Sequence, residues 1–247
     1  MKSEWKTALA GGCAGALVAL VVVFAAGALG LLPGRAGDAA LHDYLMAHPE
    51  ILVDMQTKLQ AEQDAATQET QQDAVDKLGT KAFFDPRFAY ITGPANAKRT
   101  VVEFFDYNCP YCRASIPALK AFYARHKNDT RFAFIEFPIK GPQSTLAARA
   151  ALAARRQGDK YVAFHFALMA EDGPVDSNTL MVDAKKSGLD WNKLQNDMNA
   201  PDIAFAIAAA HGLAEAAKID GTPAFIINGK IREGAINDGI LNQMARG

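Results

Sequence analysis

The pattern of hydrophobic and polar positions changes three times along this chain of 247 residues. Residues 7–32 contain no charged side chain, and lysines stand before them at positions 2 and 6. As one helix this segment would be about 39 Å long, against ~30 Å for the hydrocarbon core of a membrane. It predicts a tilted membrane anchor with a cytoplasmic N-terminus, or a signal peptide cleaved near Ala26-Gly27-Ala28. Either way the remainder is exported, which in a Gram-negative cell means to the periplasm.

A short helix seam and a polar arm follow within residues 38–80. Large apolar side chains recur in alternating steps of four and three residues, at Leu41, Leu45, Leu52, Met55 and Leu59, with His48 at the step between Leu45 and Leu52. Pro49 interrupts the seam and suits the first position of a second helix. Residues 60–77 have hardly any large apolar side chain and predict a solvated helix or linker. Since so short a unit does not fold alone, we expect either a stalk or self-association of two or three copies through residues 38–60.

From residue 84 onward strands and helices alternate. The pattern predicts strands at 87–91, 100–106 and 131–139, and a hairpin within 224–235 around the favoured two-residue turn Asn228-Gly229. It predicts helices at 110–126, 144–156, 160–171, 178–186, 191–198, 202–217 and 238–246. This order indicates an α/β sheet with a helical insertion at about 143–217. We therefore expect three parts: an anchor or signal at 1–36, a helical stalk at 38–80 and an α/β domain at 84–247.

Composition and charge refine this division. Half of the residues are apolar and 21% are charged, so the chain can bury a sizeable core. The formal net charge is -1 and no basic cluster stands out, so we expect no nucleic-acid partner. The charge is unevenly spread, because residues 38–78 contain nine acidic residues but two lysines. Such a break in charge supports separate structural units.

Two of the three cysteines form the sequence Cys109-Pro110-Tyr111-Cys112, where a predicted buried strand gives way to a helix. Cys109 should be the helix N-cap, with Pro110 at the first helical position. The unpaired amides and the dipole of a helix N-terminus stabilise a thiolate there. Cys112 would be more shielded, yet close enough to attack a mixed disulfide on Cys109. The spacing predicts Cys109 as the attacking thiol and Cys112 as the resolving thiol.

Three motifs in order resemble the thioredoxin-fold oxidoreductases of the DsbA superfamily: Glu103-Phe-Phe, the cysteine pair, and Gly-Thr222-Pro223-Ala-Phe before a hairpin. The resemblance covers residues 84–247. It implies a redox-active Cys109–Cys112 disulfide and no other cofactor. It also implies a cis peptide at Pro223 against the cysteines, a Thr222 backbone that pairs with a substrate strand, and a buried Glu103 that helps proton transfer. Asp106 is interpreted as a loop acid and not as a catalyst.

Two shorter matches refine the expected activity. Residues 44–52, with the sequence YLMAHPEIL, resemble ScsC-like proteins (suppressor of copper sensitivity C), in which the N-terminal region can drive oligomerisation. Pro110-Tyr111 and Thr222 match isomerase and reductase members such as DsbG-like proteins, while DsbA differs at both places. The resemblance implies a disulfide isomerase or reductase that acts on exported cysteine-containing clients and has a membrane redox partner. A DsbA-like dithiol oxidase is the alternative.

Other classes of protein use paired cysteines differently. A purely structural disulfide would close a four-residue ring and gain little loop entropy. Thiolate pairs also suit Cu(I), so copper binding or delivery by the same thiols is the rival function. Tetrahedral zinc needs two further ligands, and the five histidines are scattered, which favours surface or packing roles and no metal site. Kappa-glutathione-transferase-like proteins share the helical insertion but do not require two active-site cysteines.

Overall fold

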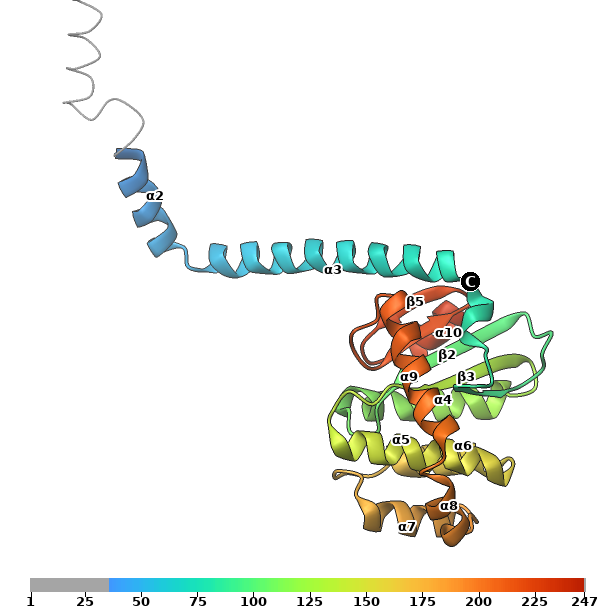
Figure 1. The fold of residues 1–247 in the computed structure, drawn as a ribbon. Coiled ribbons are helices and arrows are strands. Elements are labelled where there is room, and N and C mark those ends of the chain that lie inside the picture. Colours follow the sequence, from blue (N-terminus) through green and yellow to red (C-terminus); the bar gives the residue numbers. More distant parts are fainter. Residues whose placement is uncertain (1–35, 247) are drawn as a thin grey trace, which may run out of the picture. The chain divides into compact units, whose positions relative to one another are not determined.

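The computed structural model describes residues 36–246 of the chain (Figure 1). They fall into two units, with the division between Asp64 and Ala65. The predicted anchor or signal at residues 7–32 lies outside the described residues. Of the helices that the structure describes, none combines the length and the apolar character needed to cross a membrane.

The first unit contains helix α2 (Ala36–Ala47) and the N-terminal part of helix α3 (Glu50–Leu78). The helix is interrupted between them at His48 and Pro49, so the predicted interruption is confirmed. Pro49 immediately precedes the second helix, which begins at Glu50 and not at the proline. The large side chains of the predicted seam are exposed within this chain, as are three of their neighbours: Leu41, Tyr44, Leu45, Met46, Leu52, Val53, Met55 and Leu59. So many exposed large apolar side chains on two short helices are typical of an interaction surface.

The second unit is built on a mixed five-stranded sheet with the order β1-β3-β2-β4-β5. Strands β2 and β3 are parallel, and all other neighbours are antiparallel. The central strand β2 has the apolar sequence RTVVEFF and buries its last five side chains, because it is covered on both faces. The bounds are β1 (Ala89–Thr92), β2 (Arg99–Phe105), β3 (Thr130–Glu136), β4 (Ala224–Ile227) and β5 (Lys230–Glu233).

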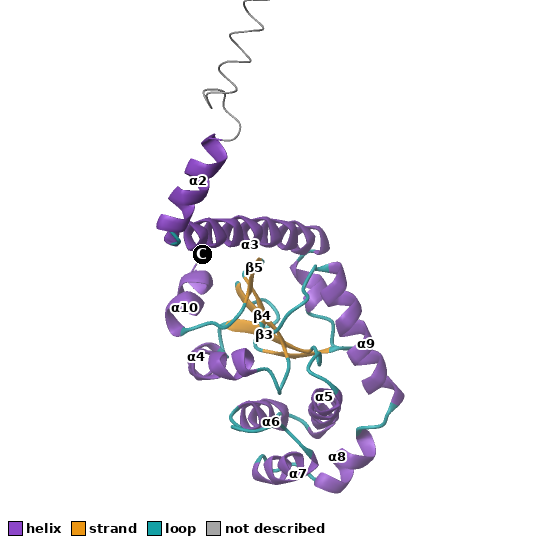
Figure 2. Ribbon diagram, turned by 90° about the vertical axis from the view of Figure 1, so that its left-hand side faces the viewer, coloured by secondary structure: helices purple, strands orange, loops and turns teal. Residues whose placement is uncertain are grey.

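Helices cover both faces of this sheet (Figure 2). Helices α4 (Pro110–His126) and α10 (Asp238–Arg246) lie on one side, and α9 (Pro201–Ala216) lies on the other. The segment between β3 and β4 supplies the predicted helical insertion, of which α9 is the last helix. Its other elements are α5 (Pro142–Ala154), η2 (Arg155–Gln157), α6 (Lys160–Met169), α7 (Ser177–Lys186) and α8 (Trp191–Asp197). A thioredoxin-type α/β fold with inserted helices, as expected from the sequence, is confirmed.

The end of α3 packs on the sheet domain through glutamine side chains. Gln71 Nε2 donates a hydrogen bond to the Lys218 carbonyl at 3.0 Å. Gln72 Nε2 donates to the Gly229 carbonyl at 2.8 Å, and the Ile231 amide donates to Gln72 Oε1 at 3.1 Å. Gln71 and Val75 are buried. The expectation that residues 60–77 are solvated is therefore wrong for the last two turns of α3. After α3, the short 3-10 helix η1 (Thr80–Phe83) leads into the sheet domain.

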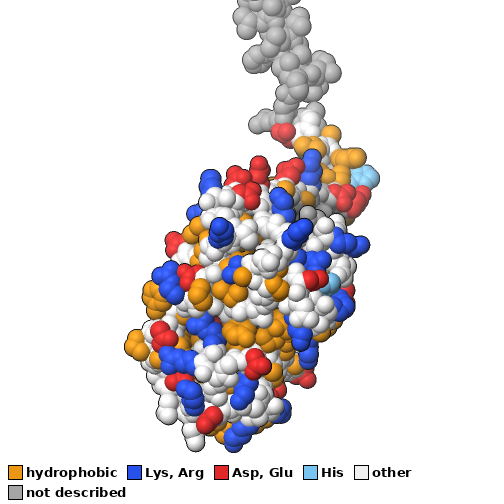
Figure 3. All heavy atoms as spheres, turned by 90° about the vertical axis from the view of Figure 1, so that its right-hand side faces the viewer, with side chains coloured by type: hydrophobic (Ala, Val, Ile, Leu, Met, Phe, Trp, Pro, Cys, Tyr) orange, Lys and Arg blue, Asp and Glu red, His pale blue; other side chains and the backbone are white. Residues whose placement is uncertain are grey.

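The surface of the molecule carries mixed charge. On the face drawn in Figure 3, basic and acidic side chains are interspersed, and hydrophobic side chains surface between them. Basic groups so mixed with acidic ones produce no large field of a single sign on this face.

The turn between β1 and β2 generates a prediction about stability. Gly93 has a φ of +85°, and a Cβ atom there would lie 2.0 Å from the Thr130 carbonyl oxygen. Gly234 has a similar φ of +84° but open space around it. We expect Gly93→Ala to lower the free energy of unfolding by about 1–3 kcal/mol more than Gly234→Ala, because the clash adds to the shared backbone strain. Chemical denaturation of the two variants measures this difference, and equal losses would contradict it.

Candidate active site

The two cysteines lie at the junction of β2 and α4. Strand β2 ends at Phe105, the chain turns over three residues, and Cys109 is the N-cap of α4 with Pro110 in the first turn. This local prediction is confirmed. Cys109 and Cys112 are free thiols and both are buried. Tyr111, between them in the sequence, is 65% exposed, so its aromatic ring is accessible from solvent.

The environments of the two thiols have opposite effects on their acidity. The hydrogen bond from Cys112, opposed by burial and helped by the Thr222 side chain and the Cys112 and Tyr111 amides, lowers the pKa of Cys109 to about 5. Burial, followed by the bond to Cys109, raises the pKa of Cys112. At neutral pH the pair therefore carries one thiolate, and this thiolate is on Cys109. A nucleophile beside a protonated thiol is the arrangement needed for disulfide exchange.

Thr222 and Pro223 approach the cysteines from a distant part of the sequence. The peptide bond between them is cis. Cys109 Sγ lies 3.1 Å from the Thr222 carbonyl oxygen, to which it donates a hydrogen bond only when it is protonated. The Thr222 hydroxyl is buried and has no hydrogen-bond partner in the described residues other than the Cys109 sulfur, whose pKa it helps to lower. The structure therefore brings together the cysteine pair and the Thr-Pro motif that the sequence predicted as parts of one site.

Glu103 is buried in the middle of β2. Its register partners are Phe134 in β3 and Phe225 in β4, so its strand neighbours are apolar. It is 1% exposed, and neither carboxyl oxygen has a hydrogen-bond partner among the described residues. Burial raises the pKa of Glu103 to about 8. The expectation of a buried carboxyl is confirmed, and its charge also contributes to the raised pKa of Cys112.

Asp106 organises the loop that leads to Cys109. Its carboxylate accepts hydrogen bonds from the amides of Asn108, Ile139 and Lys140 at 2.7 to 2.8 Å. It also accepts the hydroxyl of Ser144 at 2.7 Å. These four bonds connect the loop to the start of α5. The geometry agrees with its interpretation as a loop acid.

Several polar contacts of the site were not predicted. Arg113 donates to the carbonyls of Tyr107 at 2.9 Å and Gly173 at 2.7 Å. Asn108 Oδ1 accepts the Val175 amide at 2.8 Å. Together these bonds join the cysteine loop to the inserted helical layer. An arginine directly after the second cysteine was the only signal in the sequence.

A second group that sequence reasoning missed lies behind Glu103. His165 is fully buried, and its Nε2 atom lies 3.8 Å from Glu103 Oε2. Tyr107, Glu136 and Tyr161 continue from it as a buried polar chain. Of the two roles predicted for the scattered histidines, surface or packing, His165 has the packing role. No periodic pattern marks these residues, because each stands alone within an apolar segment.

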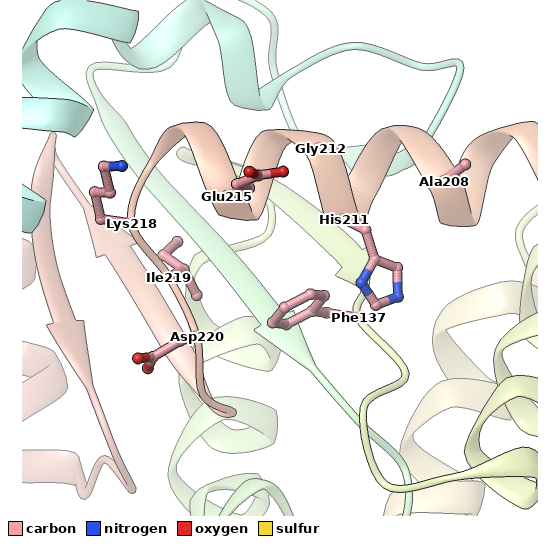
Figure 4. Close-up of a pocket in the computed structure, with 8 residues that line it drawn as sticks. All are labelled: Phe137, Ala208, His211, Gly212, Glu215, Lys218, Ile219 and Asp220. Atoms are coloured by element: carbon pink, nitrogen blue, oxygen red, sulfur yellow. The ribbon is translucent and has the colours of Figure 1, made fainter.

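A pocket with a volume of about 840 Å³ lies beside α9 (Figure 4). The His211 ring packs against Phe137 with ring centroids 4.8 Å apart, and the mouth carries mixed charge. Its lining consists of Phe137, Ala208, His211, Gly212, Glu215, Lys218, Ile219 and Asp220. This lining contains no cysteine, so thiol chemistry takes place outside it. Within residues 36–246 no group of three or more His, Cys, Asp or Glu side chains could hold a metal ion.

Comparison with known proteins finds two family models that match different parts of the chain. The sequence model of the DSBA-like thioredoxin domain matches residues 100–241. The model of the copper resistance protein ScsC N-terminal domain matches residues 38–66. The two resemblances expected from the motifs, one to DsbA-like proteins and one to ScsC-like proteins, are therefore confirmed.

Solved structures of similar fold come from several bacteria. A thioredoxin-like oxidoreductase from Silicibacter pomeroyi is 40% identical, with a TM-score of 0.61, over 66% of this chain and 93% of that chain. BcfH from Salmonella enterica Typhimurium is 27% identical, with a TM-score of 0.66, over 91% of this chain and all of its own. ScsC from Proteus mirabilis, in a transitional conformation, is 26% identical, with a TM-score of 0.62, over 86% and 93%.

Curated relatives include longer proteins. The Na(+)/H(+) antiporter NhaA 1 of Salinispora arenicola is 31% identical over 155 residues, which are 62% of this chain and 24% of the antiporter. This chain thus spans about a quarter of the length of such relatives. The probable disulfide bond formation protein D of Bacillus cereus is 29% identical over 160 residues, 58% of this chain and 74% of its own.

The asymmetry of the two thiols yields a prediction about pH. Because the Cys112 bond is the largest cause of the lowered pKa of Cys109, we expect Cys112→Ala to raise it by about one unit or more. Cys109 is a thiol below its pKa and a reactive thiolate above it. The midpoint of its alkylation rate should therefore lie near pH 5 in the unchanged protein and move to higher pH in the variant. Alkylation at a series of pH values, read by mass spectrometry, measures both midpoints; an unmoved midpoint would contradict the assigned cause.

Proposed function

Because this chain belongs to the DSBA-like thioredoxin-domain family of thiol–disulfide oxidoreductases, we propose that it exchanges disulfides with exported client proteins as an isomerase or reductase. One observation carries the proposal: the N-cap thiol Cys109, with its lowered pKa, lies against the Thr222 carbonyl and beside the protonated Cys112. The redox-active group is the Cys109–Cys112 pair itself, with no other cofactor.

Exchange begins at Cys109. Its thiolate attacks one sulfur of a client disulfide, so a Cys109–client bond forms while the client S–S bond breaks and the second client sulfur leaves with the electron pair. In isomerisation, that client thiolate attacks another client disulfide, and a client thiol finally displaces Cys109. In reduction, Cys112 loses its proton and attacks Cys109 sulfur. The client leaves reduced by two electrons, and the pair is left as a disulfide.

Glu103 and Thr222 have supporting roles in this mechanism. Glu103 is the buried base that takes the Cys112 proton, and in its acid form it returns a proton when the pair is opened again. The cis-Pro223 segment leads directly into β4 and offers its Thr222 backbone to an extended client segment. Pro110 and Tyr111 set how well the Cys109 thiolate is stabilised. Since reduction leaves the pair oxidised, a membrane redox partner must reduce it again.

Self-association through residues 38–60 supports the choice of isomerase. The exposed side chains Leu41, Leu45, Leu52, Met55 and Leu59 need an apolar partner, and the ScsC N-terminal domain match covers this region. A second or third copy of this chain is the partner we propose, because every copy offers the same seam. Such an assembly would surround a misfolded client with several cysteine pairs. It would also shield the pairs from an oxidising partner.

An exported location completes the proposal. Cytosolic proteins keep their thiols reduced, whereas exported proteins form disulfides and need exchange. The charge-free segment 7–32 would serve either as an inner-membrane anchor or as a signal that is removed, and the rest acts in the periplasm.

Two other functions have specific support. The disulfide bond formation protein among the relatives favours a dithiol oxidase, which would insert disulfides from an oxidised Cys109–Cys112 pair. The printed name of the N-terminal family, copper resistance protein, favours Cu(I) binding by the same two thiols. Copper binding predicts one Cu(I) ion per cysteine pair without disulfide turnover.

Replacing the attacking cysteine tests the proposed mechanism. We expect Cys109→Ser to reduce both insulin reduction and the refolding of scrambled ribonuclease to background, because no mixed disulfide forms. Cys112→Ser should instead accumulate the mixed disulfide, since the resolving thiol is missing. Both activities and the trapped species are measured on the same preparations. Full activity of Cys109→Ser would refute the mechanism, and faster refolding of reduced than of scrambled ribonuclease by the unchanged protein would favour the oxidase.

Charged substitutions in the seam test the assembly. Leu45 and Leu52 are exposed within one chain, so we expect Leu45→Asp/Leu52→Asp to leave the sheet domain folded but to separate the copies. Refolding of scrambled ribonuclease should then fall severalfold while insulin reduction persists. Thr57→Asp, at an exposed position on the helix face away from the seam, is the matched control and should change neither. Light scattering gives the mass of each variant. A monomeric unchanged protein would contradict the proposed assembly.

A further inference from the structure

Four buried polar side chains that the exchange mechanism does not use lie behind Glu103. Glu136 ends β3 and is paired in register with Phe105. Tyr107 lies in the loop after β2, and Tyr161 and His165 lie one turn apart on α6. All four are buried. Apolar side chains of similar size would fill these positions without the loss of solvation that buried polar groups incur.

Burial raises the pKa of Glu136 well above that of a free carboxyl, so Glu136 is an acid, and we assign its hydrogen to Oε2, the oxygen without a partner in the described residues. With this assignment Oε1 only accepts, which gives the hydrogen bonds of the group a direction. Tyr161 donates its hydroxyl hydrogen to Glu136 Oε1 at 2.9 Å, and Tyr107 donates to the same oxygen at 3.2 Å. The Tyr107 oxygen also lies 3.2 Å from His165 Nδ1. A tyrosine hydroxyl has one hydrogen to give. Because Tyr107 gives this hydrogen to Glu136, it can only accept from His165, and His165 must carry its own hydrogen on Nδ1.

The other side of the imidazole ring then faces Glu103. With hydrogen on Nδ1, a neutral imidazole has a bare lone pair on Nε2. Nε2 lies 3.8 Å from Glu103 Oε2, and neither atom has a hydrogen-bond partner in the described residues. Burial lowers the pKa of His165 to about 3, so the ring stays neutral at physiological pH. A lone pair facing a carboxyl group opposes the anion and favours the acid.

Rotation of the ring does not offer an escape, because aromatic side chains enclose it. Phe105 lies 4.6 Å from it between ring centroids, Phe134 lies 4.9 Å away, and Phe166 lies 5.1 Å away. The Tyr107 and Tyr161 rings pack against it as well. With the ring held in place, the remaining freedom is which nitrogen carries the hydrogen. Glu136 decides this through Tyr107.

We propose that Glu136, acting through Tyr107, fixes His165 in the Nδ1–H tautomer and thereby holds Glu103 as an uncharged acid beside the resolving cysteine. His165 is thus a positioning residue for the Cys112 step. Cys112 must give its proton to a Glu103 carboxylate before its sulfur attacks the mixed disulfide, breaks the Cys109–client bond and releases the client thiolate. An acid at Glu103 delays this transfer, so the mixed disulfide persists and the client has time to rearrange.

The inference rests on the proposed thiol–disulfide exchange, and a delay of this kind favours isomerisation over reduction. Several other groups act on this cluster. Burial is the largest influence on the pKa of Glu136 and raises it. The hydrogen bonds from Tyr161 and Tyr107 oppose this rise, as does the charge of Arg155, and the charge of Asp106 adds to it. The ionisable groups around Glu103 and its relay are Cys109, Cys112, Asp106, Tyr107, Glu136, Arg155, Tyr161 and His165.

Two tyrosine variants form a matched pair that tests the proposal. Tyr107→Phe and Tyr161→Phe each remove one buried hydroxyl that donates to Glu136 Oε1, and only the Tyr107 hydroxyl is also hydrogen-bonded to His165. The full-length protein carrying a peptide on Cys109 is mixed into buffers from about pH 5 to about pH 9, and peptide release by Cys112 is followed after acid quench. The release rate should rise with pH through the Glu103 titration, near pH 8 in the unchanged protein.

We expect Tyr107→Phe to move this midpoint about one unit lower and to speed release severalfold at neutral pH, because His165 can then carry its hydrogen on Nε2, which already faces the carboxylate. Tyr161→Phe should keep the original midpoint. In a His165→Phe background, Tyr107→Phe should have no further effect. Equal shifts in both tyrosine variants, no shift in either, or a shift that survives without His165 would overturn the proposal.

Nitrogen NMR of the unchanged protein gives a test that does not depend on any variant folding. The chemical shifts of the two His165 ring nitrogens should identify hydrogen on Nδ1 and a bare Nε2. Hydrogen on Nε2 would overturn the proposal. Failure of the proposed function is distinguishable, because then no peptide would form a disulfide with Cys109, or release would be as fast in Cys112→Ser as in the unchanged protein.

Discussion

The site depends on the burial of strand β2 at the centre of the sheet. Its pairing with β3 on one side and β4 on the other fixes the position from which the loop after Phe105 leads to Cys109. Phe104 is paired with Ala224, so the residues just before Ala224 lie beside the loop after β2. Cys109 and Thr222, which are 113 positions apart, therefore meet at the same end of the sheet. A shift of the β2–β4 register by one residue would turn every side chain of β4 to the other face and separate them.

Within that site, hydrogen bonds and burial have opposite effects on the pKa values of the two neighbouring thiols. Neither Cys109 nor Cys112 is accessible to solvent, yet burial is the largest influence on the pKa of Cys112, whereas at Cys109 hydrogen bonds outweigh it. The difference comes from what each sulfur receives: Cys109 receives the Cys112 thiol hydrogen and helix amides, whereas Cys112 has burial and a nearby carboxyl against it. The same burial keeps Glu103 protonated to about pH 8. One buried region thus holds a nucleophilic thiolate at Cys109, a protonated thiol at Cys112 and a protonated carboxyl group at Glu103.

Local structure could be predicted from the sequence where the hydrophobic pattern is periodic or where a proline, asparagine or glycine marks the start of a helix or a turn. Pro110 and the apolar strand before it gave α4 its bounds, and Asn228-Gly229 located the hairpin, where Asn228 has a φ of 51° and bonds to Thr100. Long-range partners could not be found in this way. The contacts of Gln71 and Gln72 depend on how the end of α3 packs on the sheet domain. In the sequence these glutamines cannot be distinguished from the exposed polar residues of the same helix.

The buried polar residues were beyond prediction for a related reason. Glu136 and His165 are each a single polar position within an apolar run, and hydrophobic periodicity treats such positions as interruptions. Their meaning comes from strand register and helix packing, which bring β3 and α6 to the same point behind Glu103. The Thr222-Pro223 motif was linked to the cysteines by its resemblance to a family and not by its spacing. Single polar residues carry little signal alone, and much once the fold places them together.

Two timescales would govern what a protein with this site does to its clients. A mixed disulfide either rearranges within the client or is resolved by Cys112, and the faster process determines whether isomerisation or reduction results. Linking several copies through the seam would act on the first process, because it raises the effective concentration of thiolates around one client. Keeping Glu103 as an acid would act on the second, because it removes the base that Cys112 needs. The seam at residues 38–60 and the buried chain behind Glu103 are separate in sequence and in structure. Both would shift the competition toward rearrangement, and either could change in evolution without altering the cysteine pair itself.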